Sequence, residues 1–126
     1  MKLNPDCIRD ILMEIESSVS LNNYLVIETD KPSSLWSTYS WEEVAYHINQ
    51  CLMSGLITNA DIYVSDGYAT ITDLSPKGHE FLANIRNDNI WTNTKSIAKK
   101  IGSTSLDALS QVASNVITTL ILSHFK

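Results

Sequence analysis

The stretch that decides the fold is residues 60–72, with the sequence ADIYVSDGYATIT. Apolar and polar residues alternate in both halves, as is typical of β-strands with one buried face. Asp66-Gly67 lies between the halves and is a strong signal for a tight two-residue turn, because both residues tolerate a left-handed backbone. The stretch therefore predicts a β-hairpin with strands over residues 60–64 and 68–72.

The residues before the hairpin predict a helix over residues 41–54. Ser40 and Glu43 have the spacing of a capping box. Gly55 supplies the left-handed residue that ends many helices. The apolar stripe of this helix consists of Trp41, Val44, Ala45, Ile48 and Leu52.

Towards the N-terminus, the pattern predicts one more helix and one more strand. Asn4-Pro5 is a helix cap followed by proline at the first helical position, and it begins an amphipathic helix over residues 5–18. Residues 24–27 form a short β-prone run. Residues 30–38 lack a helical period, so we expect a loop there.

Towards the C-terminus, three helices are expected. Ser75-Pro76 begins the first by the same cap-and-proline rule, and residues 91–101 form the second. The last helix is expected from near Thr104, where Asp107 completes a cap, to about His124.

The predicted order is helix, strand, helix, hairpin and helix, followed by two more helices. Helix–strand–helix followed by a two-stranded wing is the plan of a winged-helix domain. We therefore expect a mostly helical α+β protein with a winged-helix-like domain over residues 1–88. Residues 89–126 would form a C-terminal helical extension, packed on the same core or at a dimer interface.

Several segments of the chain have a distinctive sequence. They are residues 1–10 (MKLNPDCIRD), 43–48 (EVAYHI), 55–57 (GLI), 74–86 (LSPKGHEFLANIR) and 91–109. Together these segments resemble a phage and prophage family catalogued as domain of unknown function 2513. The run Pro76-Lys77-Gly78-His79-Glu80 is the most specific part. The resemblance implies a winged-helix-like domain and supplies no catalytic residues.

The charge of the chain argues against DNA binding, the function that this fold usually suggests. The net charge is −5 over 126 residues, and no Lys or Arg occurs from Pro32 to Pro76. A wing that binds DNA normally contacts the phosphates through Lys or Arg side chains. The alternative of a DNA-binding regulator uses the helix over residues 41–54 to read bases. Its candidate contacts would be Tyr46, His47, Asn49 and Gln50, with a small basic cluster of Lys95, Lys99 and Lys100.

No reaction chemistry is expected, and we predict that the protein is not an enzyme. His47 and Cys51 share a helix face, but a structural zinc site needs about four ligands, so neither a metal nor a cofactor is predicted. The N-terminus lacks the apolar run of a signal peptide, and no stretch reaches the roughly 18 apolar residues that span a bilayer. We therefore expect a cytoplasmic protein without a membrane segment.

The last predicted helix carries a wide apolar stripe that needs a partner surface. It either packs back on the helix over residues 5–18 or pairs with a second copy, and we favour a homodimer or higher oligomer. The candidate self-association residues are Leu106, Leu109, Val112, Val116 and Leu120. The sequence thus favours a protein-interaction module, whose further partner would be a host or phage protein.

Overall fold

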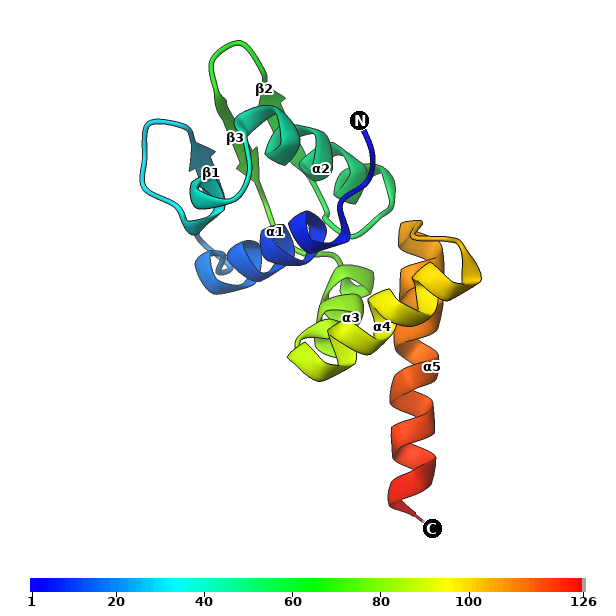
Figure 1. Cartoon of the computed structure of the whole chain (residues 1–126). Coiled ribbons are helices and arrows are strands. Elements are labelled where there is room, and N and C mark those ends of the chain that lie inside the picture. Colours follow the sequence, from blue (N-terminus) through cyan, green and yellow to red (C-terminus); the bar gives the residue numbers. More distant parts are fainter. Residues whose placement is uncertain (126) are drawn as a thin grey trace. The chain divides into compact units, whose positions relative to one another are not determined.

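The computed structural model describes residues 1–125 and divides into two compact units, an N-terminal unit over Met1–His79 and a C-terminal unit that begins at Glu80. The division falls inside a helix, earlier than the boundary expected after residue 88. The architecture is the predicted mostly helical α+β fold (Figure 1). Its elements are α1 (Pro5–Ser18), β1 (Leu25–Glu28), the 3-10 helix η1 (Ser34–Ser37), α2 (Trp41–Met53), β2 (Ala60–Tyr63), β3 (Tyr68–Ile71), α3 (Pro76–Ile85), α4 (Asp88–Ile101) and α5 (Leu106–His124).

The N-terminal unit has the winged-helix-like arrangement. Its antiparallel sheet has the order β1-β3-β2, so the first strand pairs with the far arm of the hairpin (Figure 1). Strand alternation divides the side chains between two faces. The buried face includes Leu25, Ile27, Ala69 and Ile71, and it completes a core with the apolar stripes of α1 and α2.

The hairpin turn differs from the sequence prediction. Tyr63 pairs with Tyr68, which leaves a four-residue loop in place of a two-residue turn centred on Asp66-Gly67. Gly67 has a φ of 71°, and its N–H donates to the Tyr63 carbonyl at 3.0 Å. The Gly67 carbonyl accepts from the Thr29 amide at 3.0 Å. This tertiary bond to the end of β1 stabilises the longer loop.

The expected loop over residues 30–38 contains the short helix η1, at the place where a winged-helix domain has its positioning helix. The Ser33 side chain caps it by accepting from the Leu35 amide at 3.2 Å, and Leu35 is buried. The capping box at α2 is also modified. Ser40 accepts from the Glu43 amide at 3.2 Å as predicted, but the Glu43 carboxylate accepts from the Asn4 side chain at 3.4 Å.

The motif Pro76-Lys77-Gly78-His79-Glu80 is a structural junction between α2 and α3. The Ser75 hydroxyl accepts from the Gly78 amide at 2.9 Å, and the Lys77 ammonium donates to the Ser54 carbonyl at 3.2 Å. Gly78 is buried, and a Cβ there would collide with the Leu56 carbonyl oxygen. The motif therefore holds the start of α3 against the residues that lead from α2 into the hairpin.

The C-terminal unit contains the α4–α5 hairpin. Gly102 ends α4 in the left-handed conformation, with a φ of 90°. The final helix begins later than predicted, with Ser105 as its cap. The Asp107 carboxylate accepts from the Gln111 side chain at 3.0 Å, so Asp107 does not complete the cap. The buried side chains of the two helices are Trp91, Thr94 and Ala98 from α4 and Leu109, Val112 and Ala113 from α5.

Candidate interaction surfaces

His47, a candidate base contact on α2, is fully buried. Its Nε2 accepts from the Asn4 backbone N–H at 2.7 Å, so the proton is on Nδ1, which lies 2.7 Å from the Glu43 carbonyl. Both ring nitrogens are therefore used inside the N-terminal unit. This burial removes His47 from the candidate DNA contacts and from any metal site with Cys51.

The other three candidates on α2 are more accessible. Asn49 is exposed, whereas Tyr46 and Gln50 are half-buried. The Asn49 amide lies 4.0 Å from the Met53 sulfur, and the Tyr46 ring makes an edge contact with the buried His47 ring at 5.2 Å. The surface of α2 thus offers one exposed polar side chain and two half-buried ones.

Two indole N–H groups hold the hairpin and the neighbouring end of β1 in place. Trp41 donates to the Val64 carbonyl at 3.0 Å, and Trp36 donates to the Glu28 carbonyl at 3.1 Å. The two indole rings contact each other edge to face, with 6.3 Å between centroids. These bonds tie the hairpin to the first residue of α2 and the end of β1 to η1, so the wing presents a preorganised surface.

The outer face of the sheet is acidic and aromatic. The register places Glu28, Tyr68 and Tyr63 in one row and Val26, Thr70 and Asp61 in the next. The Tyr63 and Tyr68 rings stack, with 4.6 Å between centroids and an interplanar angle of 21°. We call the face formed by these six residues the outer sheet face. It carries two carboxylates and no cation.

The three candidate lysines lie on α4. Lys95 is half-buried, with its ammonium 5.4 Å from the centre of the Trp91 ring, and Lys99 and Lys100 are exposed. The last two also occupy the final turn of α4, where cations stabilise the helix dipole. The cluster is therefore a small basic patch with an evident structural role.

The two cysteines are buried thiols. Burial raises the pKa of Cys51 to about 12, with a smaller effect from Cys7. Burial, with the carboxylates of Glu43 and Asp10, raises the pKa of Cys7 to about 12. Both thiols stay protonated at neutral pH, so they are poor nucleophiles. Within residues 1–125, no three His, Cys, Asp or Glu side chains gather as a metal site would require.

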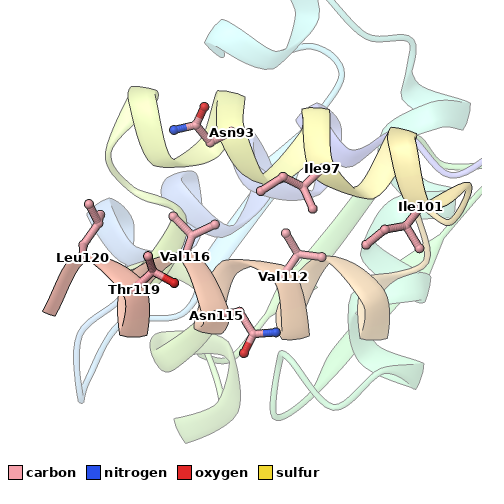
Figure 2. Close-up of a pocket in the computed structure, with 8 residues that line it drawn as sticks. All are labelled: Asn93, Ile97, Ile101, Val112, Asn115, Val116, Thr119 and Leu120. Carbon is pink, nitrogen blue, oxygen red and sulfur yellow. The ribbon is translucent and has the colours of Figure 1, made fainter. Parts of the chain in front are cut away.

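An apolar groove of about 380 Å³ runs between α4 and α5. Ile97 and Ile101 point from α4 towards Val112 and Val116 on α5, and Leu120 lies at one end (Figure 2). Asn93, Asn115 and Thr119 are the polar members of the lining. We call this feature the α4–α5 groove.

The predicted self-association stripe is divided by this packing. Leu109 is fully buried, so it packs within the chain and cannot form a dimer interface, whereas Val112 is 8% exposed and contributes only to the lining of the α4–α5 groove. Leu106 and Val116 are half-buried, and Leu120 is 50% exposed. The exposed apolar end of α5 consists of Leu120, Ile121 and Leu122 together with the cap residue Phe125, and the exposed apolar residues of α4 are Ile97 and Ile101.

Sequence reasoning missed the contribution of α4 to this surface. Ile97 and Ile101 are four residues apart and therefore share one helix face, which was the available signal.

The expectation that no segment is apolar enough to span a bilayer also needs correction. By length and composition alone, α5 is long and apolar enough to cross a membrane, and only 17% of its most apolar stretch is buried.

Fold and surface together define a winged-helix-like domain with a helical hairpin attached. The family model described as "Hypothetical protein (DUF2513)" matches residues 2–105, and the chain belongs to this family. An uncharacterised protein of Haemophilus influenzae is 33% identical over 123 residues, covering 96% of this chain and 99% of its own length. No solved structure matches the chain.

Proposed function

We propose that the protein is a non-catalytic interaction module that associates with a second copy through its C-terminal unit. The observation that carries this proposal is the α4–α5 groove beside the exposed apolar end of α5. Leu120, Ile121 and Leu122 are 50%, 51% and 61% exposed, and Phe125 is 80% exposed. A contiguous apolar surface of this kind marks an interaction site. The resemblance to a phage and prophage family supports an accessory role in a phage or prophage, and the proposal includes a cytoplasmic location.

A second copy suits this surface because a two-fold dimer uses the same patch twice. With two α5 helices antiparallel, the exposed end of each can lie along the α4–α5 groove of the other. Full burial of an exposed leucine or isoleucine contributes about 1.5–3 kcal/mol, so covering Leu120 or Ile121, each about half exposed, contributes roughly half of that. Asn93, Asn115 and Thr119 line the groove and favour a protein interface, because polar side chains are costly in hydrocarbon.

Leu120→Glu is expected to weaken the dimer at least tenfold. The substitution places a charge where the proposed interface is apolar, while leaving the buried Leu109 and Ala113 intact. Light scattering coupled to size exclusion should give twice the 14.1 kDa chain mass for the wild type and a concentration-dependent monomer for the variant.

Leu21→Glu is the matched control, since Leu21 is 101% exposed in the N-terminal unit. It should leave the dimer unchanged. A monomeric wild type, or equal weakening by both variants, would contradict the proposal. So would flotation of the wild type with phosphatidylcholine and phosphatidylglycerol vesicles if Leu120→Glu abolished it, because α5 would then bind a bilayer.

A DNA-binding regulator is the second candidate function, and the winged-helix-like topology is the observation that favours it. Exposed Asn49 and half-buried Gln50 would reach the duplex from α2. The absence of Lys and Arg from Pro32 to Pro76 opposes it. We expect no retention on duplex DNA at ~0.15 M salt, measured by fluorescence anisotropy. Tight binding that is lost in Asn49→Ala/Gln50→Ala would establish the second candidate instead.

A further inference from the structure

We propose that the outer sheet face binds an arginine side chain presented by a basic polypeptide. This inference rests on the proposed function as an interaction module and names the chemistry of its external partner. It concerns the N-terminal unit and uses none of the residues assigned to self-association.

The recognition surface is the stacked tyrosine pair. Tyr63 is 42% exposed and Tyr68 half-buried, and their rings lie nearly parallel on neighbouring strands. Tyrosine supplies a large contact area at low entropic cost, and it is enriched at the centres of protein interfaces. The tryptophan bonds to the Val64 and Glu28 carbonyls hold both ends of this face in place.

The charge on the face selects a cation. Glu28 lies directly opposite Tyr68 in the register, and Asp61 is two residues from Tyr63 on the same side of β2. Residues in these positions are separated by roughly 5–8 Å, within reach of one long side chain. The basic residue nearest to Glu28 in the sequence is Lys31, which lies in the turn after β1 and is not one of the six residues of the outer sheet face.

Arginine fits this arrangement better than lysine does. A guanidinium can stack flat on a tyrosine ring while its N–H groups pair with a carboxylate in a fork, whereas an ammonium is a compact, strongly hydrated charge. The same carboxylates repel nucleic-acid phosphates and anionic lipid head groups. The charge complementarity therefore points to a basic protein segment as the occupant.

The test is a titration of the full-length protein, labelled with ¹⁵N, with a blocked peptide in which four arginines alternate with serines. Amide shifts should centre on β2 and β3. The equivalent lysine peptide should bind at least threefold more weakly, and the glutamate peptide should cause no shifts. Tyr63→Ala should weaken arginine-peptide binding about two- to thirtyfold, the range that a cation–π contact covers, whereas Tyr63→Phe should retain most of it.

Two control variants separate this site from general attraction. Tyr24→Ala removes a tyrosine that is 64% exposed one residue before β1 and does not belong to the stacked pair, and it should leave the affinity unchanged. Asp61→Asn and Asp30→Asn each remove one negative charge from an exposed position, but only Asp61→Asn should weaken binding. Equal effects from the two would overturn the inference. So would equal affinity for the arginine and lysine peptides.

Other occupants of this face would also be visible. Shifts confined to the acidic pocket lined by Asp10, Glu14 and Glu16 would overturn the inference, as would binding of duplex DNA at β2 and β3. Dilution of the protein alone should leave the Tyr63 signals unchanged, and movement of those signals would assign the face to a second copy.

A monomer that binds the arginine peptide would contradict only the proposed dimer. A dimer that ignores the peptide would contradict only this inference.

Discussion

Gly78→Ala is expected to lower the free energy of unfolding by about 3 kcal/mol, the cost of forcing a group into closely packed surroundings. Alanine at an ordinary interior helix position is about 1 kcal/mol better than glycine. At position 78 alanine is instead expected to be less stable than glycine, because the new Cβ would collide with the Leu56 carbonyl oxygen. That carbonyl also accepts from the Ser75 amide at 3.0 Å, so it cannot turn away without losing a hydrogen bond.

Urea denaturation followed by tryptophan fluorescence measures this effect, since Trp36 and Trp41 lie in the same unit as Gly78. Glu80→Ala is the control, because Glu80 is exposed on the same helix. It should change stability by less than about 0.5 kcal/mol. A Gly78→Ala protein as stable as the wild type would show that α3 shifts away from Leu56 without cost, and the structural reading of the motif would be wrong.

His47→Leu is expected to lower the free energy of unfolding by about 2 kcal/mol. Leucine is close to histidine in size, so the main loss is polar. The Asn4 amide loses its acceptor, whereas the Glu43 carbonyl loses only a second donor, because it lies within α2 and still accepts the helix bond from the backbone amide of residue 47. A buried polar group left without its partner costs about 1–3 kcal/mol, and the Asn4 amide is that group.

The effect should extend to the start of α1. Asn4 caps this helix by accepting from the amides of Asp6 and Cys7 at 3.1 and 3.4 Å. Once the Asn4 backbone loses His47, hydrogen exchange at these two amides should accelerate. Asn49→Leu, an exposed position on the same helix, serves as the control and should leave both stability and exchange unchanged. Unaltered exchange in His47→Leu would contradict the proposed role of His47 in positioning the cap.

The His47 prediction also affects how the DNA alternative can be tested. A loss of DNA binding in a His47 variant would reflect the destabilised start of α1 and its packing on α2, whatever the surface of α2 contacts. Asn49 and Gln50 are the informative positions, because their side chains reach the surface and make few contacts inside the unit.

Local signals were sufficient for most of the secondary structure. Asn4-Pro5 begins α1, Ser40 caps α2 and Gly102 ends α4 as predicted, because caps and left-handed glycines act through neighbouring backbone groups. The order of these elements also determined the winged-helix-like arrangement. Two details were predicted wrongly. The hairpin loop is longer than predicted because the Gly67 carbonyl accepts a hydrogen bond from Thr29, which is distant in the sequence. The cap of α5 is Ser105, another capping residue close to the predicted one.

The candidate surfaces depended on tertiary packing. An apolar period shows which face of a helix avoids water, but it does not show what covers that face. Leu109 and Leu120 belong to one stripe, yet the first is fully buried and the second is half exposed. The sequence by itself therefore determined the helices, the hairpin and the distribution of charge. Only the tertiary structure decided that His47 is buried and that the Tyr63–Tyr68 pair and the end of α5 are accessible, because burial depends on residues distant in the sequence.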